Sequence, residues 1–422
     1  AVDAEDIANS FRENEKDKAK VTGEGLDEKA ENSKVDVVVD ENGNYKVILK
    51  DTINGTVTVP DNWGNVNVDL NGNDIKGPNA TDKSPAGAGL VIKKDETGTG
   101  TAGGKNPGTI LGITDSTGKG EIKGGDGSAK YPDGASGIET GTGKDKPENA
   151  GITIGTGATV SGGNGATGSD GNGGNGGNGI SGSVDTKVDG GSVSGGNGGA
   201  GADTDKGNGG NGADTDKGNG GNGGQGGAGI KTDNKPVEVD KGTVSGGAGG
   251  NGGSSTDPFG RNGGNAGNGG TGIDTGKGDI TIGKDGNTTG GSGGNGGNAS
   301  SAGGNGGNGG QGGNAANGSL DKDHAQGSVT GGAGGNGGNA DKGTAGAGGA
   351  GGSTGIAGDA AKGESGTAGV GKKDDGNGNG TVKKAVRTGD VTPIWLFVAL
   401  LAVAVSAGAV TTVSIRRRKR KR

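Results

Sequence analysis

The chain has 422 residues, of which 114 are glycine, while hydrophobic and aromatic residues make up only 25% and 2% of it. Each ordered residue costs roughly 1–2 kcal/mol of backbone entropy that apolar burial must offset, so this composition excludes an ordinary globular enzyme. The formal net charge is −7, yet residues 416–422 are all basic, which leaves 35 basic against 49 acidic residues before them. An acidic body argues against nucleic-acid binding.

Two residue types are missing altogether. The absence of Cys excludes a disulfide framework and a thiolate metal site. Met is absent even at position 1, where the chain begins with Ala1. We therefore expect that a secretory signal peptide has been removed and that the protein is exported.

The first 150 residues divide at Val35. Residues 1–34 are charged and lack periodicity, which predicts a mobile N-terminal arm. Residues 35–150 contain short alternating apolar runs separated by Gly, Asn, Asp and Pro, a pattern typical of strands and turns. No helical pattern intervenes, so the expected fold class is all-β.

Two stretches in this region, GNVNVDLNGNDIKG at 64–77 and ILGITDSTGKGEIKGG at 110–125, resemble the opening rungs of right-handed parallel β-helices of the pectate-lyase-like kind. The resemblance implies a narrow solenoid with Asn71, Gly72 and Asn73 at a tight corner. The side chains expected to point inward are those of Val66, Val68, Leu70, Ile75, Thr109, Ile110, Ile113, Ile122 and Ile138. An antiparallel β-sandwich built from the same strands is the alternative.

Residues 151–370 repeat with a variable period. Each repeat has an Ile or Leu anchor, a second short apolar segment and a glycine array of about 15 to 35 residues, by the spacing of the anchors. The anchors are Ile152, Ile180, Ile230, Ile273 and Leu320. We expect one solenoid rung per repeat, with the array leaving and re-entering the coil at one corner.

Within the arrays, two of every three residues are Gly and the third is usually Asn, Ala, Gln or Ser. A helix with three residues per turn places every third side chain along one edge and leaves bare backbone on the others. Neighbouring chains could then hydrogen-bond side by side, as in the polyglycine II-like Gly-Gly-x repeats of mycobacterial surface proteins, which these segments resemble. Disorder is the alternative, because Gly loses the most entropy on ordering.

The C-terminal end indicates a membrane anchor. After a linker at 371–390, residues 391–415 contain about 22 uncharged residues, enough to span a bilayer as one helix. Trp395 would lie at the outer interface, and Arg416, Arg417 and Arg418 begin a basic tail at 416–422 that stays in the cytoplasm, with the N-terminus outside. A buried core helix would need another long apolar element to cover it, and the sequence has none.

Before this span stands AVRTGD at 385–390. Thr-Gly followed by an apolar span and a basic tail resembles the cell-wall sorting signal of Gram-positive surface proteins. The resemblance implies that a sortase cleaves between Thr388 and Gly389 and joins Thr388 to peptidoglycan. Ala385 and Val386 replace the Leu and Pro of the family's pattern, so a single-pass membrane protein is the alternative.

Few residues suggest chemistry. GGAGADTDK at 198–206 and GGNGADTDK at 209–217 resemble the Gly-Gly-x-Gly-x-Asp calcium repeat, which would make Asp203 and Asp214 ligands. The alternative is two degenerate copies without calcium, since Asp205 and Asp216 replace the apolar residue of that repeat. No other cofactor is indicated. His324 lies in a polar context expected to be an exposed loop.

The sequence therefore predicts a parallel β-solenoid with long glycine-rich excursions and one C-terminal transmembrane helix. We expect a cell-surface protein with a structural, spacer or adhesive role, whose partners are the membrane, peptidoglycan through a sortase, and host or envelope glycans. A β-helix enzyme acting on polysaccharide is the alternative function, but no catalytic set is recognisable in the sequence.

Overall fold

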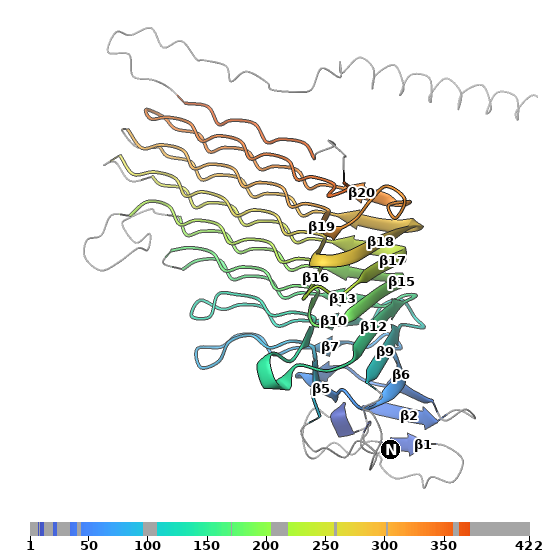
Figure 1. Ribbon diagram of the computed structural model, residues 1–422. Helices are drawn as coiled ribbons and strands as arrows, with labels where there is room; N and C mark the ends of the chain where they lie inside the picture. Colours follow the sequence, from blue (N-terminus) through green and yellow to red (C-terminus); the bar gives the residue numbers. More distant parts are fainter. Residues whose placement is uncertain are drawn as a thin grey trace, which may run out of the picture. The chain divides into compact units, whose positions relative to one another are not determined.

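The computed structural model describes the following parts of the chain. These are residues 7, 9–11, 20–22, 34–39, 44–95, 108–169, 171–203, 218–256, 260–300, 303–357 and 363–371. Within them the strands form one large, mostly parallel sheet that coils as an all-β solenoid (Figure 1). No helix in these ranges is long and apolar enough to cross a membrane, and the expected span at 391–415 lies outside them.

The strands stack in three columns, because each turn of the coil adds one strand to each column. The first column contains β3 (Tyr45–Leu49), β6 (Gly64–Asp69), β9 (Thr109–Thr114), β12 (Ala150–Gly155), the first parts of β15 (Asp185–Ser194) and β17 (Val237–Ser245), and the middle of β18 (Ile273–Thr289). The second column contains β4 (Ile53–Asn54), β7 (Ile75–Lys76), β10 (Glu121–Lys123), β13 (Thr159–Ser161), the last parts of β15, β17 and β18, and β20 (Ser328–Thr330). The third column contains β5 (Val57–Pro60), β8 (Leu90–Lys93), β11 (Ile138–Thr140), β14 (Ile180–Gly182), β16 (Ile230–Thr232), the start of β18, and β19 (Ala316–Ser319).

The interior of the coil is a continuous apolar column. In the third column Ile138 pairs in register with Ile180, Ile180 with Ile230, and Ile230 with Ile273, and all four are fully buried. Burying each such side chain stabilises the fold by about 1.5–3 kcal/mol. The inward positions expected at Val66, Val68, Leu70, Ile75, Ile113, Ile122 and Ile138 are confirmed.

Ile110 was expected inside but points outward, with 52% of its surface exposed. Its neighbour Thr109 takes the inward position and is fully buried. The Thr109 hydroxyl donates to the Pro60 carbonyl (2.7 Å) and accepts from the Trp63 N–H (2.9 Å). Because both hydrogen-bonding roles of the hydroxyl are filled, burying this polar side chain carries little penalty.

The first turn is covered by segments from the N-terminal side. β1 (Lys20–Thr22) pairs parallel with β2 (Val35–Val39), and β2 pairs antiparallel with β3. Ile7 and Phe11 are buried, and the Phe11 ring lies 6.3 Å from the ring of Trp63. The described part of the region expected as a mobile arm therefore packs against the start of the apolar column.

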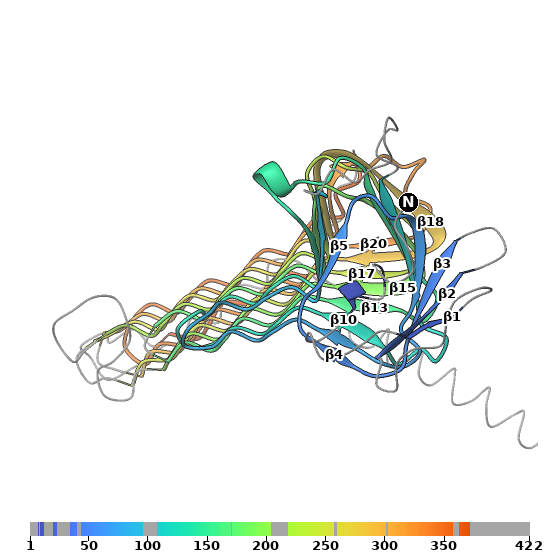
Figure 2. The same ribbon diagram turned by 90° about the horizontal axis from the view of Figure 1, so that it is seen from below.

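From the second turn on, each turn makes an excursion between its second and third columns, and the spacing of the anchors predicts those within residues 151–370. The described parts of these excursions are residues 77–89, 124–137, 162–169, 171–179, 195–203, 218–229, 246–256, 260–272, 290–300, 303–315 and 331–355. They run side by side away from the coil, as Figure 2 shows in a view from below. The 3-10 turn η1 (Gly143–Asp145) lies on the coil, between the third column and the next turn.

Candidate binding groove on the glycine-rich bundle

The excursions form a bundle with two layers, an outgoing layer of rows that leave the coil and a returning layer of rows that lead back to it. Each triplet has a first glycine, a second glycine and a third, usually polar residue. The first N–H donates along the layer, as from Gly223 to the Asn265 carbonyl in the next row (2.9 Å). The second N–H donates across layers, as from Gly224 to the Gly199 carbonyl (2.8 Å). The described rows thus satisfy their backbone donors with each other.

Most positions that face another row are glycine because the rows touch backbone to backbone, and the exceptions are alanines such as Ala166, Ala202 and Ala266. A Cβ on Gly223 would lie 2.0 Å from the carbonyl oxygen of Gly250, and one on Gly224 would lie 1.9 Å from that of Gly174. Atoms at such distances overlap, so a larger residue must push the rows apart. The third residue of the triplet instead points out of the bundle.

The third residues hydrogen-bond to the backbone of neighbouring rows. Asn222 donates its N–H to Asn172 Oδ1 (2.9 Å), Asn265 to Asn222 Oδ1 (2.9 Å) and Asn308 to Asn265 Oδ1 (2.8 Å). We call these four residues the inner ladder. Asn is favoured at this position because its carboxamide oxygen reaches the one backbone donor that the glycines leave unsatisfied.

A second, parallel ladder lies nearer the tip of the bundle. The N–H of Asn262 donates to Asn219 Oδ1 (3.0 Å), that of Asn305 to Asn262 Oδ1 (2.8 Å) and that of Thr344 to Asn305 Oδ1 (2.8 Å). We call Asn219, Asn262 and Asn305 the outer ladder. In each row the two ladders stand three residues apart, which is about 9 Å in a helix with a rise of 3.1 Å.

A groove of about 660 Å³ runs between the two ladders, across the rows of the returning layer. Its lining includes Gly220, Gly263 and Gly306, the first-position glycines of three successive rows. Arg261 and Thr344 also line the groove.

Backbone carbonyl oxygens form the floor of this groove. In a trans peptide the C=O and the following N–H point in opposite directions. Because the second-position N–H points into the bundle, the first-position carbonyl points out of it. No group in the described ranges donates to the carbonyl oxygens of Gly220, Gly263 or Gly306.

The groove therefore combines hydrogen-bond acceptors and donors without formal charge on the ladders. The floor carbonyls accept, and the ladder carboxamides present Nδ2–H groups beside them. The Oδ1 atoms of both ladders are occupied by backbone N–H groups, so the Nδ2 side of each amide is available to a ligand.

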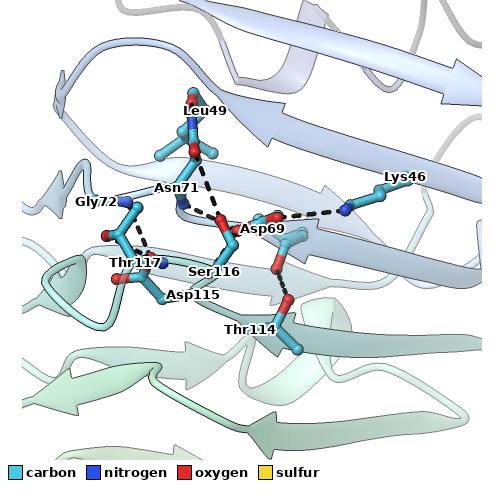
Figure 3. Close-up of polar contacts among 10 residues, drawn as sticks. Lys46, Leu49, Asp69, Asn71, Gly72, Thr114, Asp115, Ser116 and Thr117 are labelled. Atoms are coloured by element: carbon cyan, nitrogen blue, oxygen red, sulfur yellow. Dashed lines mark hydrogen bonds and ion pairs between the residues drawn. The ribbon is translucent and has the colours of Figure 1, made fainter.

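A second polar cluster lies at the corner between β6 and β7 (Figure 3). Asn71 and Gly72 have φ of 48° and 79°, which confirms the tight corner predicted there. Asp115 Oδ1 accepts from the N–H of Gly72 (2.9 Å) and of Thr117 (2.9 Å). Burial alone would raise the pKa of Asp115, but the N–H groups of Gly120, Thr117 and Gly72 outweigh it and lower the pKa to about 2.

Asp69 joins the same corner to the next turn through hydrogen bonds. Its Oδ1 accepts from the N–H of Asn71 and of Ser116, both at 3.0 Å, and its Oδ2 lies 3.2 Å from Lys46 Nζ. Burial by itself would raise the pKa of Asp69, and these contacts more than compensate, so the pKa is lowered. The contacts of both carboxylates are with corner backbone, the Thr117 hydroxyl (3.0 Å) and a neighbouring lysine, so the role of both is structural.

The residues singled out from the sequence are not brought together. Asp203 is an exposed third-position residue of the outgoing layer, and its Oδ1 accepts the Ser254 N–H (2.6 Å), while Asp214 lies outside the described ranges. In the part of the chain that the structure describes, no group of three His, Cys, Asp or Glu residues could hold a metal ion. The positions Thr388, Gly389, Trp395, Arg416, Arg417 and Arg418 also lie outside the described residues.

His324 lies on an exposed turn, as expected. Its Nδ1 is 2.7 Å from Asp321 Oδ1, and this hydrogen bond raises the pKa of His324. Sequence reasoning missed the groove, although the signal for it was present. Asn at the same triplet positions in successive arrays would have indicated the two ladders.

Comparison with known proteins gives little further guidance. No known protein family matches the chain, and no curated protein is significantly similar to it. Among solved structures, a springtail antifreeze protein from Granisotoma rainieri, described as a bundle of nine polyproline type II helices, is 29% identical over 41% of this chain and 91% of its own length. The TM-score of that pair is 0.12.

Proposed function

We propose that the protein is an exported surface protein in which the solenoid carries the glycine-rich bundle as a spacer or adhesive element. The observation that carries this proposal is the bundle itself. Its rows are joined by backbone hydrogen bonds in two directions, and its outer faces present ladders of neutral amides. Such a surface is hydrated and rich in hydrogen-bonding groups, which suits contact with polar polymers rather than chemistry.

The anchoring part of the proposal rests on the sequence. Residues 391–415 would span the membrane as a helix, residues 416–422 would remain in the cytoplasm, and Thr388-Gly389 would be the site of sortase cleavage. The pectate-lyase-like handedness of the coil belongs to the same proposal.

Fractionation of cells that express the full chain tests the surface location. Protease added to intact cells should remove the protein, and mass spectrometry of the C-terminal peptide should report its attachment. A wall-bound form ending at Thr388 supports sorting, and Thr388→Ala should then retain the tail. A detergent-extracted form that still contains Arg422 supports a single-pass membrane protein. A chain protected from protease in intact cells would refute surface exposure.

The same preparation tests the non-enzymatic role. Incubation of the purified chain with a panel of polysaccharides should release no reducing sugar. Release that continues with time and enzyme concentration would favour the β-helix enzyme instead.

A further inference from the structure

We propose that the groove between the inner and outer ladders binds a strand of neutral glycan that lies across the rows. This inference rests on the proposed adhesive function and names its ligand and its site. It begins from the repetition of one arrangement. Each of three successive rows presents a floor carbonyl, from Gly220, Gly263 or Gly306, flanked by one amide of each ladder.

The two kinds of polar group in each row suit a hydroxyl. A hydroxyl both donates and accepts, so it can donate to a floor carbonyl and accept from a ladder Nδ2–H. A carboxylate or phosphate only accepts, and it would leave the floor carbonyls unsatisfied beneath it. Arg261 in the lining would attract an anion, but the floor carbonyls of three rows need donors, so we expect the groove to favour a ligand with many neutral hydroxyl groups over a polyanion.

The dimensions favour a polymer rather than a single sugar. Hydrogen-bonded chains lie roughly 5 Å apart, which is close to the length of one pyranose ring in an extended glycan. The ladders are separated by about 9 Å, so a ring can lie between them. Successive rows then meet successive sugars with the same set of groups, which gives three equivalent subsites.

The opposite face of the bundle offers a matched control. In the outgoing layer Asn295 donates its N–H to Asn251 Oδ1 (2.8 Å), and Asn336 donates to Asn295 Oδ1 (2.9 Å). These residues have the same ladder role and are exposed. They do not line the groove.

The substitution Asn→Asp separates binding from folding. An Asp keeps an oxygen at the position that accepts the backbone N–H, but it has no Nδ2 donors. The test variant is therefore Asn222→Asp with Asn265→Asp, and the control is Asn251→Asp with Asn295→Asp. Both pairs change the net charge equally. Thermal unfolding close to that of the parent would establish that each folds.

The experiment measures binding of cello-oligosaccharides of one to six glucose residues to the full chain in lipid nanodiscs. We expect affinity to rise up to three residues and then to level off. The groove variant should lose at least about tenfold in affinity, as expected when two neutral hydrogen bonds are removed, and the control should not. Oligogalacturonate of equal length should bind more weakly than the neutral oligomers.

Three results would overturn the inference. They are no binding at millimolar glycan, affinity that does not depend on oligomer length, and equal loss in the groove and control variants. Preference for oligogalacturonate would refute the neutral class. Surface exposure is measured separately on intact cells. If the chain is exposed on the surface but binds no glycan, this inference alone is overturned. If the chain binds glycan but is not exposed, only the proposed location is overturned.

Discussion

Replacing Gly224 by Ala tests whether the bundle is held together by close backbone contact. Gly224 is a second-position glycine in the returning layer, and its added Cβ would lie 1.9 Å from the Gly174 carbonyl oxygen. The second position is the appropriate choice, because Ala266 shows that the first position of a returning row accepts a methyl group. The neighbour Gln225 is exposed and serves as the control.

The magnitude follows from the hydrogen bonds that separation of the two rows would break. The four bonds that flank Gly224 are those from Gly173 and Gly176 N–H to carbonyls of the next row (both 2.8 Å) and from Asn222 and Gln225 N–H to Asn Oδ1 atoms of the preceding row (both 2.9 Å). At about 1 kcal/mol for each bond the loss is about 4 kcal/mol. Ala has a lower conformational entropy than Gly in the unfolded chain, which stabilises the folded state by about 0.4–1 kcal/mol. We therefore expect the free energy of unfolding to fall by about 3 kcal/mol in total.

Denaturant unfolding, followed by amide exchange of the bundle, measures this loss. Gly224→Ala should lower the free energy of unfolding of the bundle by about 3 kcal/mol and speed exchange in the rows on either side. Gln225→Ala should change it by less than about 0.5 kcal/mol, as is usual for an exposed site. If the two variants unfold alike, the rows are not in backbone contact and the account of the bundle is wrong.

Three further predictions follow from the coil and the arrays. Ile180→Asp places a carboxylate in the apolar column and should cost at least about 3 kcal/mol in thermal or denaturant unfolding, whereas an unchanged midpoint would show that the coil ends before this turn. The folded pKa of Asp115, about 2, lies below its ordinary value of 3.8, so its contribution is complete above about pH 5 and is lost as the pH falls from 4 to 2. Asp115→Asn should flatten that part of the stability profile by about 2 kcal/mol, and an unaltered acid transition would contradict this structural role. First- and second-position amides in 218–227 and 303–313 should exchange far more slowly than those of an unstructured peptide, and complete exchange within seconds would show free loops.

The sequence predicts those features that depend on local pattern. The three-residue period of the arrays gives the orientation of the third side chain, and the recurrence of Ile180, Ile230 and Ile273 gives the rungs. The inward position of Ile110 was wrong because a shift of one residue exchanges the two faces of a strand. Alternation with the buried Leu111 and Ile113 places Thr109 inside and Ile110 outside, and the contacts of Thr109 with Pro60 and Trp63 satisfy its hydroxyl there.

The sequence shows the recurring Asn residues of the ladders but not the groove between them, because the groove depends on pairing between distant segments. The ladder bonds join residues 39 to 50 positions apart, as from Thr344 to Asn305 and from Asn222 to Asn172, and arrays of unequal length conceal this register. The short excursions at 77–89 and 124–137 were also missed. Pro78 and Lys83 interrupt the triplet pattern in the first of them, although its backbone already takes part in the bundle.

The two layers contain almost no apolar side chains. The change in heat capacity on unfolding should therefore differ between the bundle and the coil. Exposing apolar surface on unfolding raises the heat capacity, whereas exposing peptide groups lowers it. Unfolding the coil should therefore show the usual positive change, with a temperature of maximum stability below which cold weakens it. Unfolding the bundle exposes mainly backbone, so its stability should keep rising as the temperature falls. The two parts of one chain should thus respond to cooling in opposite directions.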